Sequence, residues 1–198
     1  MSPTEANGAG TRPPGPGPVA FQGEAGAYSE AAARLLCGAA VQTVGCVTFA
    51  EAVGAVVAGR AAAAVIPVEN VRVGRVEGAE EALAAGEAAG LRRLGGGAFR
   101  IAHALLGLPG APLAGVRRVQ SHPQALAQCR ATLARLVPAA APVPFYDTAG
   151  AARDVALRAD PALAAIAHAS AAARYGLAVL ADGLEDDPEN TTRFVLIG

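Results

Sequence analysis

The sequence predicts an α/β protein of two lobes, each built on a mostly parallel sheet, with a ligand cleft between them. Short apolar runs of strand length alternate with alanine-rich helical segments along most of the chain. This repeated strand–helix order is typical of parallel sheets with helices on both faces. Three consecutive glycines at residues 95–97 separate two such series and predict the passage from the first lobe to the second.

Residues 1–18 are rich in proline and glycine and predict a disordered tail. They lack the apolar core of a signal peptide, and no apolar run in the sequence reaches membrane-spanning length. We therefore expect a cytoplasmic, soluble protein with residues 19–198 as its folded domain. About residues 19–97 and the C-terminal strand form the first predicted lobe, and about residues 98–185 form the second.

In the first lobe, the helix after the second strand has the clearest start. Thr48 and Glu51 have the spacing of a capping box, and Gly59 is placed to end that helix. Pro67 breaks the third strand, because proline cannot donate to a sheet. The predicted strands are residues 19–21, 41–44 and 62–66, and the other helices are residues 29–37 and 76–85.

In the second lobe, an apolar run at residues 101–108 follows the glycines. The strand–helix alternation then resumes, and each helix begins with a residue that can cap it. The predicted strands of this lobe are residues 116–120, 143–146 and 163–167, and its predicted helices are residues 122–136, 148–158 and 170–175. The final predicted strand, residues 195–197, belongs to the first lobe.

Composition excludes several functions. The net charge is −1 and basic residues form no cluster, which argues against nucleic acid as a partner. All 16 basic residues are arginine, so Schiff-base chemistry, pyridoxal phosphate anchoring and a Walker-type phosphate loop are excluded. The three cysteines show no CxxC spacing and are expected to be buried thiols in a reducing compartment, with no zinc site.

Polar residues recur where predicted strands end. In open α/β sheets, ligands bind beyond the carboxyl ends of the strands, where helix N-termini favour anions. The pattern therefore predicts a site for a small anion, in either an enzyme or a binding protein. The residues at these positions are Glu69, Asn70, Ser121, His122, Asp147 and Thr148.

Structural roles compete with functional ones at these positions. Ser121 and Thr148 are placed to cap the helices that follow them. Gln128 has no such explanation, since it lies one helical turn beyond Gln124. Arg193 either pairs with a nearby acid or binds a carboxylate in a bidentate manner, for which a fixed guanidinium is suited.

Five motifs in order give the chain a family resemblance from about residue 19 to its end. The motifs are FQGEAGAYSEAA, IPVEN, SHPQALAQC, YDTAGAA and NTTRF. In this combination the chain resembles the catalytic domain of prephenate dehydratases. The resemblance implies a two-lobed fold similar to type II periplasmic binding proteins, with the active site in the cleft. It also implies conversion of prephenate to phenylpyruvate with loss of water and carbon dioxide, without cofactor or metal, and a homodimer.

The resemblance also assigns roles to residues. It implies that Thr192 is catalytic, as a hydrogen-bond donor to the departing ring hydroxyl, and that Arg193 binds a substrate carboxylate. Because prephenate is a dianion, helix N-termini near Ser29, Ser121 or Thr148 are expected to bind the second carboxylate. Glu69, Asn70 and Gln128 complete the implied catalytic set, and Phe194 is placed with the substrate-binding residues.

Residues 71–75, Val-Arg-Val-Gly-Arg, depart from the family pattern, which has hydroxyl residues after the Glu-Asn pair. The departure leaves alternatives open: a prephenate decarboxylase that keeps the ring hydroxyl, or a carboxylate-binding protein without catalysis. Arogenate, the amino analogue of prephenate, is an alternative substrate. Most family members carry a C-terminal phenylalanine-binding ACT domain, which this chain does not contain, so we expect no feedback through such a domain.

Overall fold

The computed structural model describes residues 15–198, and these form two compact units. One unit contains residues 15–23, Tyr28–Arg100 and Thr191–Gly198, and the other contains Glu24–Ala27 and Ile101–Asn190. Residues 1–14 of the predicted disordered tail lie outside the described residues. The cleft predicted between the lobes stays a prediction, since each unit is described by itself.

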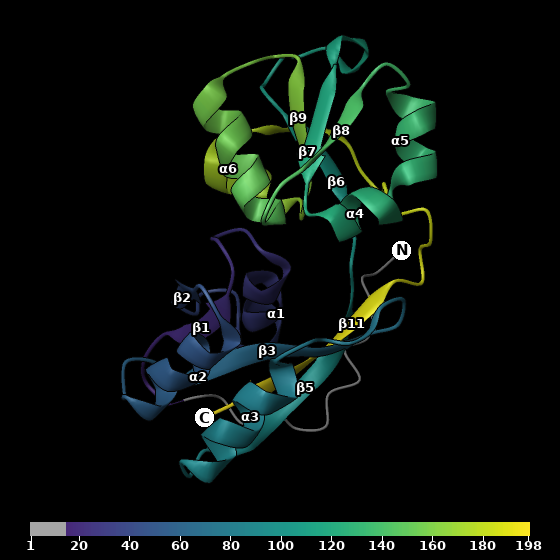
Figure 1. The fold of residues 1–198 in the computed structure, drawn as a ribbon. Coiled ribbons are helices and arrows are strands. Elements are labelled where there is room, and N and C mark those ends of the chain that lie inside the picture. Colours follow the sequence, from purple (N-terminus) through teal and green to yellow (C-terminus); the bar gives the residue numbers. More distant parts are fainter. Residues whose placement is uncertain (1–14) are drawn as a thin grey trace. The chain divides into compact units, whose positions relative to one another are not determined.

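The first unit is a six-stranded sheet with helices on both faces (Figure 1). Its strands run in the order β2-β1-β3-β11-β5, with β4 paired to β3. Its elements are β1 (Val19–Gln22), α1 (Tyr28–Cys37), β2 (Thr43–Cys46), α2 (Phe49–Val57), β3 (Ala63–Asn70), β4 (Gly74–Arg75), α3 (Ala79–Ala88), β5 (Arg93–Arg100) and β11 (Thr191–Ile197).

Two apolar clusters cover the faces of this sheet. On one face, Phe194 and Leu196 of β11 pack with Ala32 and Ala33 of α1. On the other face, residues of β11 and β3 pack against α2 and α3. Because both faces are buried, the central strands are apolar over residues 63–68 of β3 and residues 194–197 of β11.

The second unit is a five-stranded sheet in the order β10-β6-β9-β7-β8. Helices α6 and α7 pack on one face, and α4 and α5 pack on the other. Its elements are β6 (Ala104–Gly107), the 3-10 helix η1 (Leu113–Gly115), β7 (Arg118–Ser121), α4 (Pro123–Gln128), α5 (Arg130–Leu136), β8 (Ala141–Pro144), α6 (Thr148–Arg158), β9 (Leu163–Ala167), α7 (Ser170–Tyr175) and β10 (Ala178–Ala181).

The α/β class and the two sheets confirm the predicted fold class, but the prediction of mostly parallel sheets was wrong. Strands β1, β2 and β3 are parallel, as are β7, β8 and β9. Strand β11 is antiparallel to both β3 and β5, and β6 is antiparallel to both β9 and β10. Both sheets are therefore mixed, because segments distant in sequence add antiparallel strands to each parallel set.

The glycines at residues 95–97 do not form the passage between units. They lie inside β5, which pairs with β11 along its whole length. A Cβ on Gly96 would lie 2.2 Å from the Phe194 carbonyl oxygen, so only glycine permits this close approach of the two strands. The passage follows Arg100 instead.

Several predicted boundaries also change. The helix predicted at residues 76–85 is α3, three residues later, after the unpredicted strand β4. Strand β10 was also missed, and the final strand begins at Thr191 rather than at residue 195. The Thr48 cap is confirmed: its Oγ1 accepts from Glu51 N at 3.1 Å, and Glu51 Oε2 reaches back to Val47 N at 2.8 Å.

The helix predicted at residues 122–136 is broken at Cys129. In an unbroken helix, the Gln128 carbonyl would accept from Thr132 N. Instead it accepts from Asp186 N at 2.8 Å, while Thr132 N donates to Asp186 Oδ1 at 2.8 Å. The backbone N–H and the carboxylate of Asp186 thus take the place of one hydrogen bond of the helix.

Candidate functional site

The ends of β3 and β11 bring Asn70 and Thr192 together in the first unit. The two strands are antiparallel, and Thr192 lies directly opposite Asn70 in their register. Asn70 Nδ2 donates to Thr192 Oγ1 at 2.8 Å, and the Thr192 residue is 7% exposed. Two residues that are 122 positions apart in sequence therefore form one polar group at the end of the sheet.

The orientation of the Asn70 amide is fixed by its other contacts. Its Oδ1 accepts from Arg72 N at 2.9 Å and from Val73 N at 3.2 Å, which an NH2 group could not do. Nδ2 must therefore face Thr192, and Thr192 Oγ1 must accept. A hydroxyl that accepts in this way keeps its own hydrogen for donation to another group.

Thr192 and Arg193 point to opposite faces of the sheet. Along β11, Phe194 packs against the α1 face and Val195 against the opposite face. The register with β5 is regular through this stretch, so alternation places Thr192 on the α1 face and Arg193 on the other. The two residues therefore do not share one face of the sheet, as expected for neighbours in a strand.

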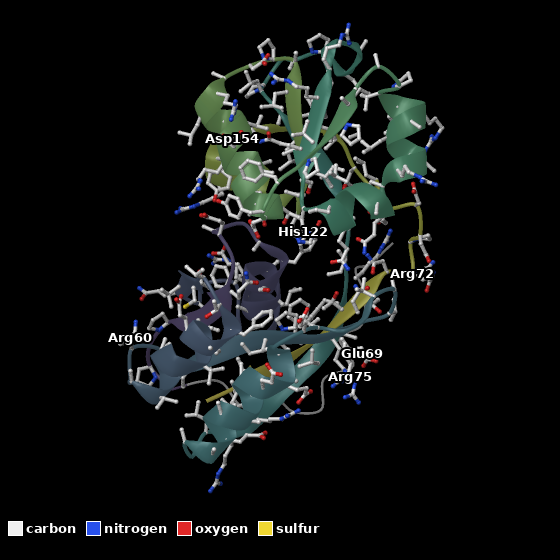
Figure 2. The ribbon with its side chains drawn as sticks, viewed as in Figure 1. Arg60, Glu69, Arg72, Arg75, His122 and Asp154 are labelled. Carbon is white, nitrogen blue, oxygen red and sulfur yellow. The ribbon has the colours of Figure 1, made fainter. Side chains whose placement is uncertain are left out.

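Arg193 pairs with Glu69 across the strands. Arg193 Nη2 lies 3.2 Å from Glu69 Oε2, and both side chains are 52% exposed. Arg75 of β4 lies opposite Glu69 on its other side, and Figure 2 shows the Glu69 and Arg75 side chains near each other at this edge. Glu69 is therefore a surface carboxylate between two cationic strand neighbours, and an ion pair with an acid is the role that Arg193 has in this structure.

The departing segment, residues 71–75, forms a hairpin between β3 and β4. Its turn is held by Asn70, whose side chain accepts from the backbone of Arg72 and Val73. Val71 and Val73 are 61% and 55% exposed. The same asparagine thus both orients Thr192 and shapes the hairpin.

Ser29 lies in the first turn of α1 and is 8% exposed. Strands β1 and β3 are parallel, with Phe21 paired to Val65, and β3 continues beyond the end of β1 to Asn70. Helix α1 begins soon after β1 and packs on the face that carries Thr192. Helix N-termini favour anions, so a role of this first turn in anion binding stays a prediction.

Phe194 is a core residue. It is 2% exposed, and its ring centroid lies 5.8 Å from that of Phe99. Its predicted place among the substrate-binding residues is therefore corrected: the ring anchors β11 in the sheet.

In the second unit, Ser121 is also structural. It is fully buried, and its hydroxyl donates to the Ile166 carbonyl of β9 at 2.6 Å. The predicted capping role was wrong, because His122 caps α4 with Nδ1, which accepts from Gln124 N at 3.3 Å. Ser121 has one hydrogen, so it cannot also donate to a ligand.

Thr148 was likewise predicted to cap α6, but the cap is Asp147. Asp147 Oδ1 accepts from Gly150 N at 2.7 Å. Desolvation raises the pKa of Asp147, while bonds from the N–H groups of Gly150 and Ala149 act in the opposite direction. Thr148 is half-buried in the first helical turn, and within residues 15–198 its hydroxyl has no protein partner, so it is free for a ligand.

Gln128 has two side-chain partners at its Oε1, one of which sequence reasoning missed, and the His103 ring donates there in its Nε2–H tautomer. Its Oε1 accepts from Asn190 Nδ2 at 3.2 Å and contacts His103 Nε2 at 2.8 Å. His103 is 2% exposed, and desolvation lowers its pKa, against the opposing effects of Gln128 and Glu185. The available signal was a histidine inside the apolar run at residues 101–108.

No group of three or more histidine, cysteine, aspartate or glutamate side chains within residues 15–198 is placed to hold a metal ion. Over the same residues, no helix is both long and apolar enough to cross a bilayer.

Comparison with known proteins places this arrangement in a family. The family model for prephenate dehydratase matches residues 19–198. Arogenate dehydratase 5 of Arabidopsis thaliana, a chloroplastic protein, is 40% identical over 197 residues, covering 100% of this chain and 44% of its own length. A bifunctional N-acyl-homoserine lactone acylase/prephenate dehydratase of Komagataeibacter europaeus is 41% identical over 178 residues, covering 90% of this chain and 61% of its own.

Among solved structures, prephenate dehydratase from Arthrobacter aurescens in complex with L-Phe aligns with a TM-score of 0.82 and 34% identity. The alignment covers 91% of this chain and 59% of that one. The chain spans about half the length of the curated relatives it matches. A family model over nearly the whole described chain, with relatives at this identity, is decisive: the chain belongs to the prephenate dehydratase family.

Proposed function

We propose that this domain is a lyase that converts prephenate to phenylpyruvate and so serves phenylalanine biosynthesis. The observation that carries the proposal is the bond from Asn70 to Thr192, because it leaves the Thr192 hydroxyl able to donate. Family membership supplies the substrate class. The proposed location in the cytoplasm rests on the sequence, and the proposed homodimer rests on the family resemblance.

In the proposed reaction, the bond from the ring to its carboxylate breaks and carbon dioxide leaves. That electron pair moves through the ring and expels the hydroxyl oxygen, which takes up one proton and leaves as water. Thr192 stabilises the charge that develops on the departing oxygen by donating a hydrogen bond to it. A single preorganised donor of this kind is worth about 10²–10³ in rate.

The two carboxylates of the substrate need cationic or N–H partners. Each unit offers one candidate for such a role: the first turn of α1, near Ser29, in the first unit, and the first turn of α6, with Thr148, in the second. Arg193 remains a proposed carboxylate ligand, although using it requires its guanidinium to share or leave Glu69. Both side chains are half-exposed, so the cost of that exchange is small.

The hairpin at residues 71–75 supports a second candidate. Val71 is 61% exposed where the family pattern has a hydroxyl residue, and a prephenate decarboxylase that keeps the ring hydroxyl would need less help at that oxygen. The Asn70–Thr192 pair favours the dehydratase. The names of the relatives include both arogenate and prephenate dehydratases, so arogenate stands beside prephenate as a proposed substrate.

The test is product analysis with each substrate. Purified protein is incubated with prephenate and, separately, with arogenate. Phenylpyruvate, detected by its absorbance in alkali, is expected from prephenate. Phenylalanine would form from arogenate by the same loss of water and carbon dioxide. A non-aromatic dihydro product would favour the decarboxylase, and tight binding without turnover would favour a binding protein.

A further inference from the structure

With His103 in its Nε2–H tautomer, the carboxamide of Gln128 can act on a ligand only as a donor. Its Oε1 is occupied by Asn190 Nδ2 and by His103 Nε2, so both acceptor positions of that oxygen are used. The Nε2 group has no protein partner within residues 15–198, where no buried side-chain nitrogen or oxygen lacks a partner. Nε2 therefore reaches solvent and presents N–H groups outward.

His103 determines this polarity. If it donates, its Nε2 must carry the hydrogen, and Gln128 must turn its oxygen toward the ring. Burial lowers the pKa of His103 below its ordinary value of 6.5, so the neutral ring, with a single N–H to donate, predominates at pH 7. An Nε2–H ring therefore selects one of the two flip states of the Gln128 amide.

The backbone of His103 is itself fixed on both sides. Its N–H donates to the buried Glu185 carboxylate at 2.8 Å, and its carbonyl accepts from Leu184 N at 2.9 Å. The next residue in that segment, Asp186, donates its N–H to the Gln128 carbonyl at 2.8 Å. Residues 184–186 thus hold the backbones of both His103 and Gln128, which keeps the ring and the amide at a constant separation.

We propose that His103 is a positioning residue, which orients the Gln128 carboxamide so that its NH2 group donates to an oxygen of the substrate. The acceptor is a carboxylate or the departing hydroxyl. The inference rests on the proposed function for the identity of the substrate. The geometry of the Gln128 amide does not depend on which substrate is bound: both acceptor positions of Oε1 are used, and the NH2 group faces solvent.

A matched pair of variants tests the role of the ring. In His103→Gln, the side-chain amide places an N–H at about the position of the imidazole Nε2. In His103→Asn, the amide reaches only the position of Nδ1. We expect kcat/KM within about threefold of wild type for His103→Gln and about ten- to hundredfold lower for His103→Asn. Rescue by the longer amide alone would show that the Nε2 donor, rather than bulk, is what matters.

Gln128→Glu tests the amide without disturbing its support. A carboxylate still accepts from His103 and Asn190 but has no N–H to donate. The variant is expected to unfold at the same urea concentration as wild type and to lose at least tenfold in kcat/KM. Near-wild-type turnover in Gln128→Glu, or in a folded His103→Asn, would overturn the proposal.

A readout without turnover separates this proposal from the proposed function. The side-chain NH2 signals of Gln128 in a ¹⁵N-correlated spectrum, assigned by their loss in Gln128→Glu, are expected to keep their positions in His103→Gln and to move in His103→Asn. If no substrate is turned over but the spectra behave in this way, positioning stands and the reaction assignment fails. Unmoved signals in His103→Asn would refute positioning whatever the activity.

Discussion

Asn70 donates to Thr192 across two antiparallel strands, 2.8 Å from nitrogen to oxygen, and its own oxygen is occupied by two backbone N–H groups of the hairpin that follows. The direction of this bond is therefore set by backbone geometry. It prepares the threonine hydroxyl as a donor before any ligand arrives, which is the kind of preorganisation that lowers a barrier.

Asn70→Asp separates the two roles of the asparagine. A carboxylate can still accept from Arg72 N and Val73 N, but it cannot donate to Thr192. The hairpin should persist, while the Thr192 hydroxyl turns to donate to the new carboxylate and becomes unavailable. We expect kcat to fall by about 10²-fold, with an unchanged circular dichroism spectrum. Wild-type kcat in this variant would show that Thr192 needs no orientation by residue 70.

Ser121→Ala should damage stability more than chemistry. The fully buried hydroxyl bonds the Ile166 carbonyl, and its loss is expected to lower the free energy of unfolding by about 1–3 kcal/mol in urea titrations. The kcat of the folded variant should remain within about tenfold of wild type. A variant of unaltered stability that had lost activity would instead place Ser121 on the substrate.

Arg193 and Glu69 call for a double-mutant cycle. Because both side chains are half-exposed, we expect their coupling energy for unfolding to be below about 1 kcal/mol. If Arg193 binds a substrate carboxylate, Arg193→Ala raises KM whether or not Glu69 is present, and Glu69→Ala alone does not. An unchanged KM in Arg193→Ala would show that Arg193 does not bind the substrate and that its role is the ion pair with Glu69.

The buried histidine predicts a pH dependence of stability. The pKa of His103 is lower in the folded protein than its ordinary value of 6.5, because burial disfavours the charged ring. Below pH 6.5 the unfolded chain then binds more protons, so the free energy of unfolding is largest above that pH and falls as the pH drops through it. The slope approaches about 1.4 kcal/mol per pH unit for one such group.

His103→Gln should reduce that slope, measured by urea unfolding between pH 7.5 and 5, without abolishing it. His168 contributes in the same direction, because desolvation lowers its pKa as well. An identical pH profile in wild type and variant would mean that His103 is not held neutral in the folded state.

Local signals in the sequence predicted most of the helices and strands. The capping pair Thr48 and Glu51 and the apolar run of β3 each depend on neighbours in the chain, so periodicity was enough. The errors arose where residues distant in sequence determine the local structure. Asp186 interrupts the helix at residues 123–136 although it lies more than 50 positions from Thr132. Gly96 has the sequence context of a linker, but it lies in a strand where only glycine leaves room for the Phe194 carbonyl.

The candidate site shows the same division. The motifs placed Asn70 and Thr192 at strand ends, and the strand register then brought them into contact. Ser121 and Thr148 looked like helix caps, yet the residue next to each is the cap, since a shift of one position is invisible to sequence patterns. His103 was missed because its partner Gln128 lies on another element, 25 residues away.

The most direct measurement compares phenylpyruvate formation from prephenate by the wild-type protein and by Thr192→Val, which keeps the shape of the side chain but removes its hydroxyl. The account predicts steady phenylpyruvate production by wild type and a kcat about 10²–10³-fold lower in the variant, with a modest change in KM. Absence of phenylpyruvate with wild type, or equal rates for the two proteins, would contradict it.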